Sequence, residues 1–339
     1  MMWDFWSLNP ESLHQVLILM SDRGTPYGYR HMHGFGSHTF SMINHDNERV
    51  WVKFHFKTQQ GIKNFSHDDA VKMKGENPDF AQEDLVTAIE NGNFPKWTLY
   101  IQVMTEEQAN EFRWNPFDVT KVWLKSEFPL IEVGEMELNE IPANFFAHVE
   151  QATFSPSNLI NGISFSPDKM LQGRLFSYPD AHRYRVGVNA NQLEVNRCPF
   201  AVNNYQRDGA MADSSRYKDM PNYFPNSFDD IKPDPQYKNF EYDLDSTNVA
   251  HFNRNEDDDD HYTQPGLLYT KAMNQEDRDH LIYNIISSMK GISGPKRDEI
   301  INRQLCHFFR ANIELGMKIA LGLQINIDAN MMNHSKTEF

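Results

Sequence analysis

Alternation between apolar and polar residues predicts an antiparallel sheet in the first third of the chain. Over residues 50–57, V-W-V-K-F-H-F-K, valine and phenylalanine alternate with tryptophan, histidine and lysine, which is the period of a β-strand. Residues 37–43 are its expected hairpin partner across the turn 44–47, and residues 97–104 predict a third strand. Residues 120–123 predict a further short strand.

Apolar residues spaced three or four positions apart predict a helix over residues 13–20. We expect Asn9 to cap this helix, because asparagine is favoured at that position, and Pro10 suits the first turn. Gly24 is the expected terminator, since glycine tolerates the backbone conformation in which many helices end.

Further helical patterns divide the rest of the chain. Residues 68–91 predict short amphipathic helices between two strands, and residues 275–290 and 298–323 predict longer helices, the first ended by Gly291. Residues 142–251 show poor periodicity and are rich in Pro, Asn, Asp and Ser. Such a length is unusual for a loop within a compact domain, so we expect an extended segment that wraps other parts or other subunits.

Composition and charge exclude several classes of function. The chain has 339 residues and a formal net charge of -15, which argues against nucleic acid as the main partner. No apolar stretch is long enough to predict a membrane span, and no signal peptide or peroxisomal tail is recognisable, which favours the cytoplasm. The run Glu256–Asp260 is expected to be a solvated loop rather than a cation site.

Cys198 and Cys306 predict a reducing compartment, with both thiols buried as small apolar groups.

The residues around Tyr178 form the most specific chemical pattern in the sequence. On a helix Arg174, Tyr178, His182 and Arg185 fall at i, i+4, i+8 and i+11, on one face, and Pro179 is expected to kink that helix. A guanidinium one turn away favours the phenolate, an oxygen donor suited to ferric iron. His182 and Arg185 could then pair with carboxylates such as haem propionates. Spacing alone favours a different interpretation, an exposed tyrosine in cation–π contact with arginine.

The sequence R-L-F-S-Y-P-D-A-H-R-Y-R-V-G, residues 174–187, closely resembles the proximal haem-ligand signature of monofunctional haem catalases. The resemblance extends from Met1 to about Leu323 and does not depend on one motif. Further stretches similar to the same family are W-D-F-W with P-E-S-L-H-Q-V (3–16), S-D-R-G (21–24), H-M-H-G-F-G-S-H-T-F (31–40), G-I-K-N (61–64), N-P-F-D-V-T-K-V-W (115–123), D-K-M-L-Q-G-R-L-F (168–176) and N-N-Y-Q-R-D-G (203–209).

The resemblance implies an α+β fold of the small-subunit branch. Residues 1–140 would form the second part of an antiparallel β-barrel, residues 141–255 a long wrapping segment with the proximal haem helix, and residues 256–339 a C-terminal helical domain. It also implies a homotetramer with haem b, with NADPH as a second candidate cofactor, and dismutation of hydrogen peroxide to water and oxygen in the response to oxidative stress. Neither nucleic acid nor a membrane is an expected partner.

The resemblance also assigns roles to residues. Tyr178 would ligate the iron, and Arg174 would keep its oxygen anionic as part of the catalytic machinery. Met170, His182 and Arg185 would line the haem, with Ser37 nearby. Lys125 stands where many NADPH-binding members carry histidine. The positions that match the NADPH-binding branch are His14, Ser21, Arg23, His55, Lys57, Val122 and Trp123.

The distal side of the haem is where the sequence departs from the family. The family uses a histidine in an R-G-x-H context and an asparagine, both upstream of W-D-F-W, and none of the 14 histidines here follows R-G-x. Without an acid–base group on that side, peroxide cleavage should slow by about 10²–10⁴-fold. We therefore expect a partial sequence. The alternative is a haem-binding or subunit-interaction module without turnover.

Three neighbouring histidines leave a second chemistry open. His31, His33 and His38 could form a metal site of the kind found in other β-barrels, but no carboxylate follows at a matching spacing. Histidines with structural hydrogen bonds are the favoured interpretation. On general grounds His14, within an apolar helix stripe, would also be a core histidine with satisfied hydrogen bonds.

Overall fold

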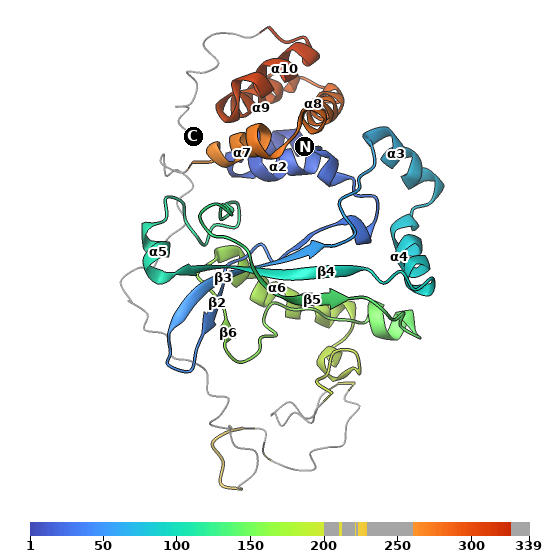
Figure 1. Cartoon of the computed structure of the whole chain (residues 1–339), viewed down its shortest axis with the longest axis vertical. Coiled ribbons are helices and arrows are strands. Elements are labelled where there is room, and N and C mark those ends of the chain that lie inside the picture. The colour runs from blue at the N-terminus through green and yellow to red at the C-terminus, as the bar shows by residue number, and fades with distance from the viewer. Residues whose placement is uncertain (200–209, 212–220, 222, 229–259, 327–339) are drawn as a thin grey trace.

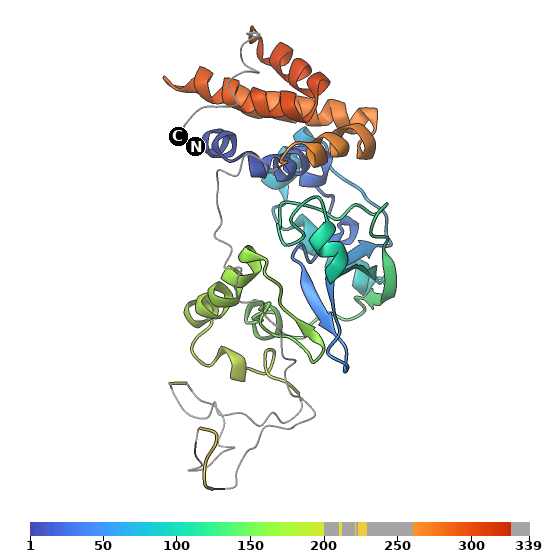
Figure 2. The same ribbon diagram turned by 90° about the vertical axis from the view of Figure 1, so that its left-hand side faces the viewer.

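The protein consists of a curled antiparallel sheet with a separate cluster of helices above it (Figure 1). The structure, a computed structural model, describes residues 1–199, 210–211, 221, 223–228 and 260–326. In Figure 2 the same two layers are seen from the side, and a long helix, α6 (Lys169–Arg185), lies away from the helical cluster. The expected α+β class is confirmed.

The sheet has the strand order β5-β4-β3-β2-β6, with β1 paired to β3, and every pairing is antiparallel. The hairpin predicted from the sequence is present, because Phe40 pairs with Val52 and the turn closes at Asn47, whose φ is 63°. The strands are β1 (Gly34–Phe35), β2 (Phe40–Ile43), β3 (Arg49–Thr58), β4 (Lys96–Thr105), β5 (Ile131–Glu137) and β6 (Ile163–Ser164).

Two strand predictions fail in opposite directions. The predicted strand at residues 120–123 is wrong, since the backbone N–H and carbonyl of Val122 bond to the side chain of Gln264 at 2.9 Å each and not to a neighbouring strand. The edge strand β5 was not predicted. All of its residues are exposed, so it lacks the alternation of a half-buried strand.

Helices from both ends of the chain form one unit. Trp3, Leu13, Val16 and Leu17 share a buried apolar core with residues between Tyr262 and Leu323. The contributing helices are α1 (Met2–Leu8), α2 (Leu13–Met20), α7 (Thr263–Leu267), the π-helical η7 (Leu268–Ala272), α8 (Gln275–Lys290), α9 (Arg297–Ala311) and α10 (Ile313–Leu323).

The other helices are short, and α4 is the longest of them with 11 residues. They are η1 (Pro10–Ser12), η2 (Asp22–Gly24), η3 (Tyr29–His31), α3 (His67–Glu76), α4 (Phe80–Glu90), α5 (Glu106–Glu111), η4 (Phe146–Glu150) and η5 (Ala190–Gln192). Helices α3 and α4 confirm the prediction for residues 68–91. Among the described residues, no helix is sufficiently long and apolar to cross a bilayer.

Details of the helix ends differ from expectation. The side chain of Asn9 does not cap the helix that follows, because its amide donates to the carbonyl of Phe5 at 2.6 Å. Helix α2 ends at Met20, where Ser21 becomes extended. The pattern at 298–323 is two helices, because Asn312 leaves the helical conformation and caps α10 through the N–H of Leu315 at 3.0 Å.

The acidic run lies almost wholly outside the described residues, and the cysteines differ from expectation. Residues 256–259 and most of the segment 200–251 lie outside the described residues. Asp260 accepts hydrogen bonds from the N–H groups of Tyr262 and Thr263 at the start of α7, at 3.0 and 2.9 Å. The prediction of two buried thiols is wrong, since Cys198 is exposed and Cys306 is only half-buried.

Gly266 marks a close approach between the backbones of two helices of this unit. A Cβ atom at this position would lie 2.4 Å from the carbonyl oxygen of Ala311, so the backbone of α9 would have to move. We expect Gly266→Ala to lower the free energy of unfolding by about 1–3 kcal/mol, as overpacked cores do. Urea denaturation followed by circular dichroism measures this. Gly75→Ala is the control, because a Cβ there meets nothing within 4 Å.

Candidate functional site

Helix α6 carries the tyrosine singled out from the sequence. Asp168 begins the helix by accepting a hydrogen bond from the N–H of Leu171 at 3.0 Å, which satisfies one of the free donors at the helix start. The helix then continues through Pro179 to Arg185.

Tyr178 and Arg174 are in direct contact. Arg174 Nη2 donates to the phenol oxygen of Tyr178 at 2.7 Å, and the guanidinium carbon lies 4.7 Å from the ring centroid. Both side chains are half-buried. This hydrogen bond fixes the phenol oxygen beside a positive charge, so the pair presents an oxygen donor of the kind that iron(III) binds.

The other predicted residues of this site are placed as follows. The ring of His182 lies 6.0 Å from that of Tyr178, and burial together with the charge of Arg185 lowers the pKa of His182. Arg185 donates to the carbonyls of Glu150 and Ala152 at 2.6 and 2.7 Å, which holds the end of α6 against η4. Met170 is exposed on α6. Ser37, also exposed, has a left-handed backbone, with φ of 62°.

A buried contact that the sequence did not predict joins α6 to the sheet. Nδ1 of His38 lies 2.7 Å from Oδ2 of Asp168, and both side chains are at most 3% exposed. Ser166 donates to the carbonyl of Thr39 in the same region, and Thr39 donates to the carbonyl of Pro116 at 2.7 Å. These contacts fix the start of the Tyr178 helix to the strand that follows His38. An aspartate directly before a helix was the available sequence signal.

The three neighbouring histidines do not form a metal site. His31 bonds to the carbonyl of Gly61 at 2.9 Å, His33 accepts from the N–H of Thr58 at 3.1 Å, and His38 bonds to Asp168. In the part of the chain that the structure describes, no group of three metal-binding side chains occurs. The interpretation as structural histidines is confirmed.

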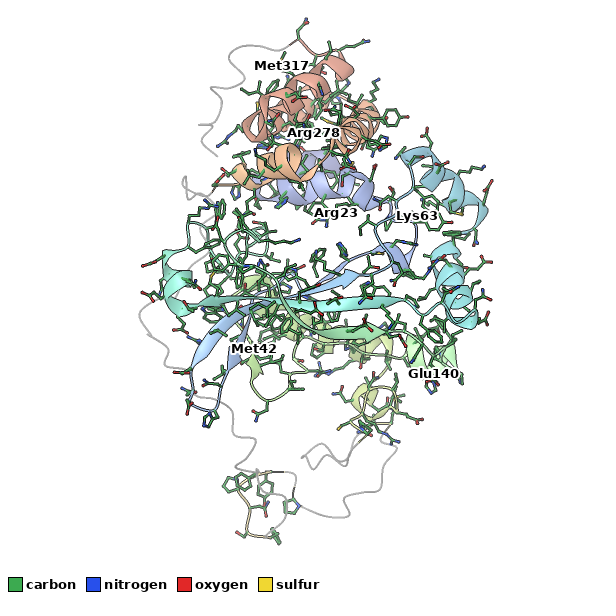
Figure 3. The ribbon with its side chains drawn as sticks, viewed as in Figure 1. Arg23, Met42, Lys63, Glu140, Arg278 and Met317 are labelled. Atoms are coloured by element: carbon green, nitrogen blue, oxygen red, sulfur yellow. The ribbon has the colours of Figure 1, made fainter. Side chains whose placement is uncertain are left out.

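A second cluster, rich in basic residues, lies between the sheet and the helical unit. Phe35 is at its centre, with Lys57 Nζ 4.4 Å and the guanidinium carbon of Arg23 6.0 Å from its ring centroid. The rings of His55 and His33 meet it edge-on, at 5.6 and 6.1 Å. Figure 3 shows Arg23 between α2 and the sheet. We call the following residues the basic face: His14, Arg23, His33, Lys53, His55, Lys57 and Lys125.

Strand β3 explains why three of these residues point the same way. Lys53, His55 and Lys57 alternate with Val52, Phe54 and Phe56, so they share one side of the sheet. Burial lowers the pKa of Lys53 and of Lys57 to about 8. Burial also lowers the pKa of His14, His33 and His55 to about 4. The face therefore carries less positive charge than its composition suggests.

Two buried polar atoms, one in the basic face and one in Trp123 against Lys53, lack a partner among the described residues. Nε2 of His55 lies 2.9 Å from Gln102 Oε1, which leaves Nδ1 without a hydrogen bond. The indole N–H of Trp123 is also unpaired, and this residue is only 3% exposed. Buried polar atoms are normally satisfied, so both atoms are available to hydrogen-bond a bound group. Lys53 is already engaged, with Nζ 3.1 Å from the carbonyl of Lys121.

The remaining residues predicted for nucleotide binding are partly structural. Ser21 is buried, accepts from the N–H of Arg23 at 3.3 Å and donates to the carbonyl of Ile18 at 2.7 Å. Val122 pairs its backbone with Gln264, but its side chain is exposed. Phe35, His33 and Lys53 were not predicted for this site. Only the alternation along β3 indicated Lys53.

Comparison with protein families gives two matches. Residues 1–230 match the family model described as Catalase, and residues 255–323 match that described as Catalase-related immune-responsive. A catalase from the Onchocerca volvulus endobacterium is 54% identical over 329 residues, covering 97% of this chain and 67% of its own length. Catalase A of Pseudomonas putida is 53% identical over 327 residues, which cover 96% of this chain and 66% of that protein.

Solved structures show the same likeness. A bacterial catalase superimposes with a TM-score of 0.87 at 41% identity, over 95% of this chain and 65% of its own. Catalase A from Saccharomyces cerevisiae gives a TM-score of 0.82 at 38% identity, over 95% and 66%. The chain thus spans about two thirds of the length of the relatives it matches.

Proposed function

The chain belongs to the catalase family, and on that premise we propose that it acts in the dismutation of hydrogen peroxide to water and oxygen. The observation that carries the proposal is the 2.7 Å contact between Arg174 Nη2 and the phenol oxygen of Tyr178. It joins an oxygen donor to a cation that stabilises its charge, on the helix that matches the family's haem-ligand signature.

The residues present fit a haem b group. Tyr178 would supply the oxygen that holds the iron, and Arg174 would donate a hydrogen bond to that oxygen. His182 and Met170 lie on the same helix and would line the porphyrin. When bound, the haem supplies the iron at which peroxide is both reduced and oxidised.

By the same family membership we propose a homotetramer, which sedimentation velocity would test.

The proposal is tested by comparing hemin binding to the parent protein and to the variant Arg174→Gln. The purified parent protein should bind hemin with an absorption spectrum typical of phenolate-ligated iron(III). Replacing Arg174 removes the hydrogen bond to the ligand oxygen, and loss of such a partner typically lowers metal affinity or activity by about 10–100-fold. Hemin titration and oxygen release from peroxide measure the two effects. Arg183→Gln, an exposed arginine of the same helix, should bind hemin like the parent. Equal loss in both variants would contradict the assigned role.

We also propose that the basic face binds NADPH. Its cations, the unpaired Nδ1 of His55 and the unpaired indole N–H of Trp123 suit a phosphate-bearing ligand with polar groups. His14, Ser21, Arg23, Lys57 and Val122 surround or border them at the matching family positions. Lys125, in place of the more frequent histidine, adds a cation to the face.

A further inference from the structure

Lys57 is surrounded by positive charge. Its ammonium lies 4.4 Å from the centre of the Phe35 ring, an exposed aromatic surface shared with Arg23. Lys125 and Arg23 are the charged groups that act on it, and both disfavour its protonated form. His55 on the same strand and His33 on the segment before β1 complete the neighbourhood, and both are ordinarily neutral at pH 7.

Lys53, the other strand lysine, has a different environment. It is almost fully buried and donates to the carbonyl of Lys121, and the charges of Asp168 and Asp118 favour its protonated form. No carboxylate of the described residues is among the groups that act in this way on Lys57. Unlike Lys53, Lys57 therefore has no carboxylate of the described residues acting on it, and a bound anion would supply that opposite charge.

We propose that the basic face takes up a proton at Lys57 when it binds a phosphate-bearing anion, so that its affinity for the anion falls as the solution becomes alkaline. This inference concerns the proposed NADPH site and rests in part on that proposal. An anion attracts the ammonium and offsets the repulsion from Arg23 and Lys125, so the bound state holds the proton more tightly than the free state. Binding and protonation must then be linked.

The direction and the pH window follow from the free protein. Burial and the neighbouring cations lower the pKa of Lys57 to about 8, while an anion would return it toward the ordinary value of about 10.4. Below pH 7 the lysine is charged in both states, and affinity does not depend on it. Between pH 7 and pH 9 the free state loses its proton, so affinity should fall by about 10-fold. A phosphate monoester is already fully ionised in this range, since its second pKa is about 6.

Isothermal titration calorimetry with NADPH tests the coupling directly. At pH 8 about half of the free lysine is protonated, so binding should take up about half a proton, measured as the difference in heat between Tris and HEPES buffers. Lys57→Arg keeps the positive charge but does not titrate. This variant should show no such uptake, nearly constant affinity from pH 7 to pH 9, and tighter binding than the parent at pH 9. Lys63→Arg is the control, because Lys63 lies over Tyr27 and outside the basic face.

The outcomes separate the coupling from the cofactor. NADPH binding without proton uptake in the parent, or with the same uptake in Lys57→Arg, would overturn the coupling and leave the cofactor proposal standing. If NADPH fails to bind but inorganic sulfate, an anion that does not titrate in this range, binds with uptake, the coupling is supported and the cofactor is wrong. If neither anion binds, both proposals fall.

Discussion

Tyr178→Phe is expected to abolish stable haem binding and, with it, oxygen release from peroxide. The substitution removes one oxygen atom and keeps the ring, so the 6.0 Å contact with His182 can persist. The iron would lose its protein ligand, and Arg174 would lose the acceptor of its 2.7 Å hydrogen bond. Loss of a residue that only hydrogen-bonds to a metal ligand lowers metal affinity or activity by about 10–100-fold. Loss of the ligand itself should therefore lower haem affinity by more than that.

Hemin titration followed by absorption spectroscopy measures the effect, with oxygen release as the second readout. Tyr184→Phe is the matched control, because Tyr184 lies on the same helix but is 86% exposed. Tyr184→Phe should unfold within about 0.5 kcal/mol of the parent, as surface changes usually do. An unchanged haem spectrum in Tyr178→Phe would show that another residue ligates the iron.

Local features of the site could be predicted from the sequence because they depend on short spacings. Arg174 and Tyr178 are one helical turn apart, so the helix alone brings them together. Likewise, the two-residue period of β3 places Lys53, His55 and Lys57 on one side of the sheet.

Contacts between distant segments left no comparable signal. His38 and Asp168 are separated by 130 residues, and each is compatible with an ordinary role in its own segment, a loop histidine and a helix cap. The same holds for the packing of α1 and α2 against the C-terminal helices, which only the tertiary fold determines. Edge strand β5 was missed because both of its sides are exposed, so burial imposed no alternation on its sequence.

The basic face combines features that short sequence spacings predict with features that only the tertiary fold determines. Its strand residues follow from periodicity, but their surroundings come from three other segments that supply Arg23, Phe35 and Lys125. The charges on these residues then interact, and burial removes water from several of them. The number of protons the face holds at pH 7 is thus a property of the assembled fold, and residue counts would overestimate it.

The second large effect is expected at Asp168, whose buried side chain makes two hydrogen bonds. Oδ2 lies 2.7 Å from His38 Nδ1, and Oδ1 accepts from the N–H of Leu171 at 3.0 Å. A buried hydrogen bond to a charged group contributes about 1.5–3 kcal/mol, and a helix cap contributes about 1 kcal/mol. Asp168→Ala should therefore lower the free energy of unfolding by about 3 kcal/mol, measured by urea denaturation.

Asp168→Asn separates the two contributions. Asparagine caps helices as well as aspartate does, so the contact with Leu171 can remain. Its single acceptor oxygen is then occupied, and its amide faces His38 without the negative charge. We expect a loss of about 1–3 kcal/mol, smaller than for alanine. Asp180→Ala, an exposed aspartate of α6, should change stability by less than about 0.5 kcal/mol. If Asp168→Ala matched Asp180→Ala, the buried pair would not be what fixes the Tyr178 helix to the sheet.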